Sequence, residues 1–144
     1  MPLNAVDVIL GRAARLRDQA ALLTAAGPVT YGELAALVER AAAALKGFGL
    51  RRGQTVSLLL KDSPLFCAAY LGVLKAGGVV VPLNSRLSAD DLSYVLADCA
   101  ACLLLADADQ LPAGLRGPRV VLRDELQRAV DGAAPGFATV ATDA

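Results

Sequence analysis

Few side chains in this 144-residue sequence could do chemistry, and their spacing argues against most catalytic sites. No histidine occurs, so Ser-His-Asp triads, Cys-His pairs and metal sites built on imidazole are excluded within it. Cys99 and Cys102 form a C-x-x-C motif, the spacing of many zinc and redox sites. With Cys67 as the third cysteine, a four-ligand zinc site is incomplete. A redox thiol needs a helix N-terminus, whereas this pair follows a predicted helix, so we interpret both cysteines as structural.

Carboxylate pairs at Asp90-Asp91 and at Asp107 and Asp109 are candidates for acid–base work or Mg²⁺ binding. The first pair lies at a predicted helix start, where negative charge is favoured. The second lies in a predicted loop, where acidic residues are common. Lys75 lies in the last turn of a predicted helix, where a cation complements the helix dipole. We therefore assign no catalytic, cofactor-binding or metal-binding residue to this sequence.

Glycine-rich phosphate-binding motifs are also missing. Neither G-x-G-x-x-G nor G-x-x-x-x-G-K-[ST] occurs in the sequence. The nearest matches are Gly47 with Gly49, and Gly77 with Gly78, and each follows a predicted helix. They do not place helix N-terminal amides against a phosphate, so we interpret both as helix ends in the left-handed conformation.

Helix-start signals define the elements that would position any site. Thr30 and Glu33 have the spacing of a capping box, and apolar residues with a period near 3.6 follow as far as Phe48. Ser63-Pro64 predicts a cap and first position for a helix over residues 64–75. Ser88 and Asp91 predict a second capping box, and a short helix is expected over residues 124–130.

Between these helices lie four short segments that are apolar over all or part of their length, at residues 54–60, 79–83, 101–105 and 119–122. Runs without polar alternation are typical of strands buried on both faces of a parallel sheet. The alternation of strands and helices predicts an α/β fold with a mostly parallel sheet and helices on both faces. We expect one subdomain over residues 1–130 and a linker over residues 131–144, which are rich in Gly, Ala and Pro. The strand order stays open.

The charge balance, hydropathy and cysteine count of the sequence limit the partners and the compartment that we expect. Fourteen basic and fourteen acidic residues cancel, which disfavours nucleic acid and anionic membranes. No apolar run is long enough for a membrane-spanning helix, and residues 1–16 lack the apolar core of a signal peptide. The odd number of cysteines agrees with a reducing compartment, so we expect a cytoplasmic protein. Hydrophobic residues make up 56% of the chain, and we expect homo-oligomers through exposed apolar surface.

Two segments resemble the adenylate-forming enzymes, which include the AMP-forming acyl-CoA ligases. TYGEL at residues 30–34 is similar to the first signature of that family, and LKAGGVVVPLN at residues 74–84 is similar to the second. Asn84 and the following Arg86-Leu87 favour the acyl-CoA ligase branch over the peptide-synthetase branch. The resemblance implies the N-terminal subdomain of that fold, in which both signatures are structural rather than catalytic.

The resemblance further implies an ATP-dependent carboxylic acid–CoA ligase that uses ATP, Mg²⁺ and CoA. The family's phosphate loop, ribose-binding Asp and adenylation lysine have no counterpart in these residues. We therefore expect a truncated scaffold part that is inactive alone. Two alternatives are a stand-alone, non-catalytic interaction module of the same fold and an unrelated flavodoxin-like binding domain, which the missing phosphate turn disfavours.

Overall fold

The structure is a computed structural model that describes residues 4–142. In these residues it contains a four-stranded sheet, a separate two-stranded hairpin, five α-helices and one short 3-10 helix. The elements in chain order are α1 (Ala5–Leu10), β1 (Ala20–Thr24), β2 (Gly27–Thr30), α2 (Tyr31–Gly47), β3 (Thr55–Leu59), α3 (Pro64–Lys75), β4 (Val79–Pro82), α4 (Ala89–Asp98), β5 (Ala101–Ala106), η1 (Ala108–Gln110), β6 (Arg119–Leu122) and α5 (Arg123–Gly132). No helix among the described residues is long and apolar enough to cross a membrane.

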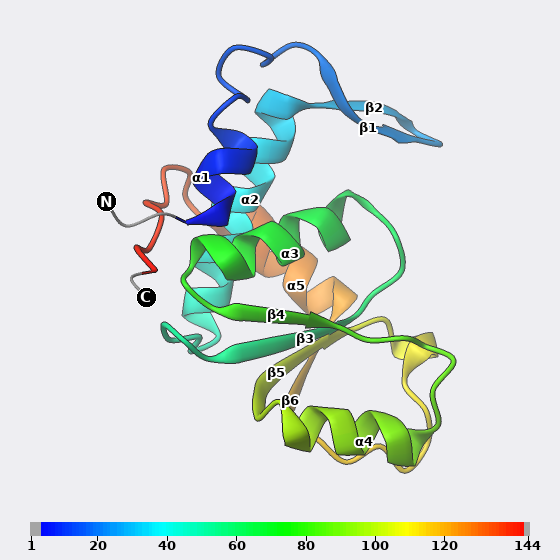
Figure 1. Ribbon diagram of the computed structural model, residues 1–144. Helices are drawn as coiled ribbons and strands as arrows, with labels where there is room; N and C mark the ends of the chain where they lie inside the picture. The colour runs from blue at the N-terminus through cyan, green and yellow to red at the C-terminus, as the bar shows by residue number, and fades with distance from the viewer. Residues whose placement is uncertain (1–3, 143–144) are drawn as a thin grey trace.

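The main sheet has the strand order β4-β3-β5-β6, and every pair of neighbours is parallel. The central strands β3 and β5 are buried along most of their length, as predicted. The prediction was wrong for β4 and β6, which are edge strands (Figure 1). Val79 is 49% exposed, and only Val121 of β6 is buried. An edge strand has one neighbour instead of two, and an apolar run alone does not reveal which strands lie at the edge.

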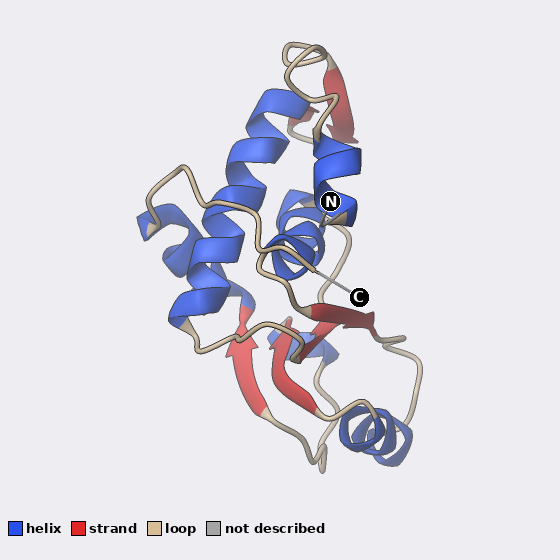
Figure 2. Cartoon of the chain, turned by 60° about the vertical axis from the view of Figure 1, so that its left-hand side comes forward, coloured by secondary structure: helices blue, strands red, loops and turns tan. Residues whose placement is uncertain are grey.

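Helices cover both faces of the sheet, as predicted (Figures 1 and 2). Leu103 and Leu105 point to the face that packs against α2, α3 and α5. Leu104, between them, points to the opposite face and packs with Leu92 and Leu96 of α4. This alternation along β5 is the strand period of two, and it explains why a run of consecutive leucines is buried on both sides.

Helices α2, α3 and α4 begin directly after the capping residues that the sequence predicts, and hydrogen bonds with those residues hold the first turns. At the start of α2, the Glu33 amide donates to Thr30 Oγ1 (3.2 Å) and the Thr30 amide donates to the Glu33 carboxylate (2.8 Å). Ser63 Oγ accepts the Phe66 amide at the start of α3 (3.1 Å). At α4 only half of the predicted box forms, because the Asp91 carboxylate accepts the Ser88 hydroxyl instead of its backbone N–H. Aspartate is one methylene shorter than the glutamate of a complete box.

Two helix ends use the left-handed backbone that glycine tolerates. Gly49 (φ +96°) follows α2, and Gly77 (φ +79°) follows α3. Gly47 is an ordinary helical residue of α2, so the prediction of a left-handed role for it was wrong. A single left-handed residue is sufficient to end the helix.

The sequence patterns did not reveal α1 or the antiparallel β1–β2 hairpin. The hairpin projects away from the main sheet, next to the start of α2 (Figure 1). Its turn is held by Thr24, whose hydroxyl donates to the Gly27 carbonyl (2.7 Å) and accepts the Ala26 amide (3.2 Å). Gly27 has φ +121°. Gly27-Pro28 was the available turn signal, but the flanking strands are too short to show a clear alternation.

Residues after α5 return to the N-terminal half of the chain. The Val140 amide donates to the Lys75 carbonyl (2.8 Å). Asn4, which is buried, donates its side-chain amide to the carbonyls of Leu74 (2.7 Å) and Val140 (3.0 Å). These bonds satisfy carbonyls at the end of α3 and bring the two ends of the described chain together (Figure 2). The role of residues 131–144 as a linker stays a prediction.

Helices α2 and α3 form the largest helix–helix contact, and small residues allow it. A Cβ added at Gly72 of α3 would lie 2.9 Å from the Ala41 Cβ and 3.1 Å from the Ala42 amide nitrogen of α2. These are backbone and near-backbone atoms that cannot rotate away. The distance between the two helices is therefore set by the absence of a side chain at residue 72.

We predict that Gly72→Ala destabilises the protein by about 1–3 kcal/mol, because the overpacking outweighs the roughly 1 kcal/mol gain in helix propensity. Gly47→Ala is the matched control, since a Cβ there meets no atom within 4 Å. It should leave stability unchanged or raise it slightly. Urea unfolding of both variants is the measurement. Equal stability of Gly72→Ala and wild type would show that α2 and α3 can move apart freely.

Candidate functional site

The carboxyl ends of β3 and β5 are the candidate site. After β3 the chain adds β4 on one side of that strand, and then crosses to place β5 on the other side. This reversal is a topological switch point, and ligands of open α/β sheets bind in the crevice beyond the strand ends at such a point. The residues that follow β3 and β5 are therefore the first to consider.

An ion pair lies at this position. Asp107 directly follows β5 and is only 7% exposed. Arg123, the first residue of α5, donates Nε to Asp107 Oδ1 and Nη2 to Asp107 Oδ2, the latter at 2.9 Å. This two-pronged geometry is the strongest form of a carboxylate–guanidinium contact. It joins the end of a central strand to the start of the helix that follows the edge strand β6.

Further hydrogen bonds extend the pair to the loop after β3. The Lys61 amide donates to Asp107 Oδ2 (2.7 Å). Arg123 also donates to Ser63 Oγ (3.2 Å) and to the Lys61 carbonyl (3.2 Å). Ser63 is the cap of α3, so one network connects the starts of α3 and α5 to the end of β5. The hydrogen bond from Arg123 is the main reason why the pKa of Asp107 lies below its usual value, and the bond to Asp107 raises the pKa of Arg123.

Beside the network lies an open crevice of about 430 Å³ between the ends of β3 and β4. Its polar lining comes from Lys61, Asp62, Asn84, Ser85 and Gln110. The Lys61 ammonium pairs with the exposed Asp109 carboxylate at its border. The lining offers a cation, a carboxylate, amides and a hydroxyl, which are suited to hold a polar ligand.

In the structure, each of the four predicted carboxylates has a hydrogen-bond or ion-pair partner. Asp107 and Asp109 are near each other, but each is paired with a cation, so neither is the free acid or base that the spacing allowed. Asp91 caps α4, and Asp90 forms an exposed ion pair with Arg116 (3.3 Å). The sequence reasoning missed Arg123 and Lys61. Both are distant from Asp107 along the chain, and no local motif marks them.

Cys99 and Cys102 lie at the end of α4 and in β5, and their structural role stays a prediction. All three cysteines are free thiols. Cys99 ends α4, and its Sγ lies 3.7 Å from Ser57 Oγ. Burial raises the pKa of the Cys102 thiol, and burial followed by the charge of Asp62 raises that of Cys67. No group of three or more His, Cys, Asp or Glu that could hold a metal ion occurs among residues 4–142.

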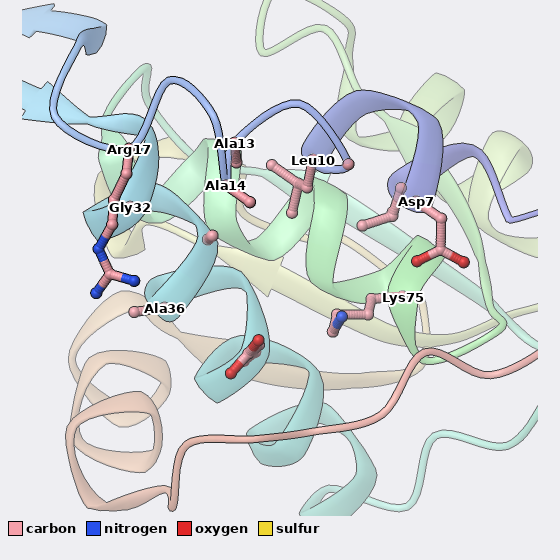
Figure 3. A pocket seen from close by; sticks show the side chains of 12 residues that line it. Asp7, Leu10, Ala13, Ala14, Arg17, Gly32, Ala36 and Lys75 are labelled. Carbon is pink, nitrogen blue, oxygen red and sulfur yellow. The ribbon is translucent and has the colours of Figure 1, made fainter.

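A second cavity, of about 510 Å³, lies between α1, α2 and the last turn of α3 (Figure 3). Its wall is largely small and apolar, with Asp7, Glu39 and Lys75 among its charged groups. Gly136 and Thr139, which follow α5, form hydrogen bonds with these three charged groups. The Thr139 hydroxyl accepts a hydrogen bond from Lys75 Nζ (2.9 Å) and donates one to Asp7 Oδ1 (2.8 Å). The Gly136 amide donates a hydrogen bond to Glu39 Oε2 (2.8 Å). Lys75 lies in the last turn of α3, as predicted, and its bond to Thr139 is structural.

Comparison with known proteins places this arrangement in one family. Residues 11–139 match the family described as AMP-binding enzyme, so the chain belongs to that family. The 3-hydroxybenzoate–CoA ligase of an Aromatoleum species is 43% identical over 135 residues, which are 88% of this chain and 26% of that protein. The 3-hydroxybenzoate–CoA/4-hydroxybenzoate–CoA ligase of Thauera aromatica is 45% identical over 111 residues, or 76% of this chain and 21% of that protein.

A solved benzoate CoA ligase from Burkholderia xenovorans superposes with a TM-score of 0.88 at 25% identity, over 98% of this chain and 31% of that one. An N-terminal subdomain of NpsA from Klebsiella oxytoca superposes with a TM-score of 0.82 at 24% identity, over 99% of this chain and 36% of that one. The predicted N-terminal α/β subdomain of the adenylate-forming fold is therefore confirmed. The chain spans about a quarter of the length of the curated ligases it matches.

We predict that Asp107→Asn lowers the free energy of unfolding by about 1–3 kcal/mol, because it leaves the partly buried Arg123 guanidinium without its counter-charge. The matched control is Asp109→Asn, which removes an exposed ion pair and should cost less than about 1 kcal/mol. Denaturant unfolding at neutral pH is the measurement. Equal losses in the two variants would show that burial adds nothing to the Asp107 pair.

The pH dependence of this difference follows from the lowered pKa of Asp107. In the unfolded chain the carboxyl titrates near its ordinary value of about 3.9. The stabilisation should be complete above that pH and should decline as the pH falls through the lower folded-state value. The stability difference between wild type and Asp107→Asn should therefore be flat above about pH 5 and shrink in stronger acid.

Proposed function

We propose that this chain is the N-terminal scaffold part of an ATP-dependent carboxylic acid–CoA ligase that forms an acyl adenylate, and that it catalyses no reaction alone. Family membership supports the ligase class. The observation that carries the non-catalytic role is the neutralised switch point, where Asp107 and Arg123 engage each other and the loop after β3. The position where this fold would bind a reacting group is used here for structure.

Adenylate formation makes demands that these residues do not meet. Attack of a carboxylate on the α-phosphate of ATP needs positive groups and Mg²⁺ to neutralise the charge that develops. Within residues 4–142 no acidic cluster could hold the ion. Arg123 is committed to Asp107, and the Lys61 ammonium pairs with Asp109. The ATP, Mg²⁺ and CoA used by the family would accordingly be bound mainly by segments other than this one.

The chain can still contribute part of a substrate-binding wall. The crevice lined by Lys61, Asp62, Asn84, Ser85 and Gln110 lies open at the carboxyl edge and offers polar contacts. Two of the most similar relatives are ligases named for hydroxybenzoates. We therefore extend the proposal to an aromatic acid as the substrate class of the whole enzyme. The free thiols of all three cysteines agree with a reducing, cytoplasmic setting.

The first test is an assay of the chain itself. Purified protein is incubated with ATP, Mg²⁺ and a panel of benzoates, hydroxybenzoates and fatty acids, and ATP–pyrophosphate exchange is followed. We predict no exchange above background, because no residue of the chain stabilises the transition state. The Thauera aromatica ligase serves as the positive control. Exchange that rises in proportion to the concentration of this chain would contradict the proposal.

The second test measures whether this chain can serve as the scaffold of an active ligase. Residues 11–139 replace the matching segment of the Thauera aromatica ligase, and the chimera is assayed with 3-hydroxybenzoate. We predict activity within about tenfold of the parent, a loss below about 1.4 kcal/mol of transition-state free energy. Thermal unfolding confirms that the chimera folds. A folded but inactive chimera would favour the alternative, a non-catalytic interaction module of the same fold.

A further inference from the structure

Arg40 of α2 lines a surface groove and has no partner among residues 4–142. Arg40 has a buried Nε, and its guanidinium forms no hydrogen bond or ion pair with any residue that the structure describes. Taking a cation partly out of water without a counter-charge costs free energy. Arginine is also the residue best suited to grip a carboxylate with two N–H groups at once. The outer nitrogens of Arg40 therefore offer a strong site for an incoming carboxylate.

The surroundings of Arg40 are apolar and shaped as a groove. A depression of about 410 Å³ lies between α2 and β2, lined by Pro28, Val29, Ala36, Leu37, Glu33 and Arg40. Ala36 also borders the cavity between α1 and α2 (Figure 3), so it lies between that cavity and this groove. A small side chain at such a position allows another helix to approach closely. The groove thus combines apolar contact with one charge at each end.

The residues that face this groove from α2 follow helical spacing. We call Glu33, Ala36, Leu37 and Arg40 the α2 stripe. Glu33 and Arg40 are seven residues apart, or about 10.5 Å along the helix, with the two apolar residues between them. An acid and a base placed symmetrically about an apolar centre make a surface that is complementary to itself. In an antiparallel pair of such helices, each Glu33 meets the Arg40 of the other helix, and Ala36 meets Leu37.

We propose that the α2 stripe is a homodimer interface, in which α2 packs antiparallel against α2 of a second copy about a twofold axis between Ala36 and Leu37. Charge complementarity selects this occupant, because the two charges of the stripe satisfy each other only across such an axis. Glu33 is free to take part. One of its oxygens accepts the Thr30 amide, and a carboxylate has further acceptor positions on the exposed side. The zero net charge of the chain adds no long-range repulsion.

The interface is short, so the dimer is expected to be weak. Two helical turns and the adjoining rim of β2 bury less than the roughly 800 Å² per partner of a standard stable complex. We expect dissociation on the order of 100 µM, the regime of small transient interfaces. Sedimentation velocity from about 5 µM to 1 mM covers this range. A compact monomer of this length has a radius of gyration of about 14–15 Å, which gives small-angle scattering a reference value.

A charge swap tests the geometry. Arg40→Glu places two acids on the stripe, and Glu33→Arg places two bases there. Each variant alone should dimerise at least about tenfold more weakly than wild type, because like charges meet across the axis. An equimolar mixture of the two should form heterodimers, because every contact is then between opposite charges. Dimerisation of wild type identifies the antiparallel arrangement, because a parallel pair of wild-type helices would place Glu33 against Glu33 and Arg40 against Arg40.

Matched variants keep the result interpretable. Arg40→Lys retains the charge and should retain most of the dimer, whereas Arg40→Gln should weaken it. Glu33→Gln keeps the capping box and removes only the charge, so it replaces Glu33→Arg if thermal unfolding shows that the latter is unstable. Arg40→Glu alone must then still lose dimerisation. The proposal is overturned if wild type stays monomeric throughout, if Arg40→Glu dimerises as well as wild type, or if the mixed swap variants do not associate.

Discussion

Asp107 leaves the end of β5 and accepts hydrogen bonds from the Arg123 guanidinium and from the Lys61 amide, so three chain segments meet at one carboxylate. Those segments are the loop into α3, the loop out of β5 and the start of α5. Parallel strands cannot be joined by tight turns and need long crossover connections. Here a two-pronged ion pair, in which Asp107 is only 7% exposed, joins three of these connecting segments at the carboxyl ends of the strands.

The same helical layer depends on a second, steric constraint. Gly72 allows α3 to contact the backbone of α2, and the inward side of α2 is accordingly built from small and medium apolar residues. Its outward side carries Glu33 and Arg40 around an apolar centre. One helix therefore serves two surfaces with different chemistry. Close packing inside the layer leaves the position of the outer stripe fixed, as a specific interface requires.

The chain belongs to the AMP-binding enzyme family, and at its switch point Asp107 is paired with Arg123, while all three cysteines are free thiols. The signatures that carry the family resemblance turn out to be a capping box at Thr30 and a helix end at Gly77 followed by an edge strand. The charged residues of these signatures have contacts within the chain: Glu33 completes the capping box at Thr30, and Lys75 donates to Thr139.

Local chemistry explains what the sequence determined by itself. The starts of α2 and α3, the glycine that ends α3 and the buried alternation of β5 each depend on residues within about one helical turn or one strand, so they could be predicted. The hairpin β1–β2 could not, because its short strands carry too little pattern. Tertiary structure alone decided that β4 and β6 lie at the edges, that Arg123 reaches back to Ser63 and Lys61, and that Arg40 lines a groove without a partner among residues 4–142. Such contacts join residues that are distant along the chain, and only the order of the strands brings them within hydrogen-bonding distance.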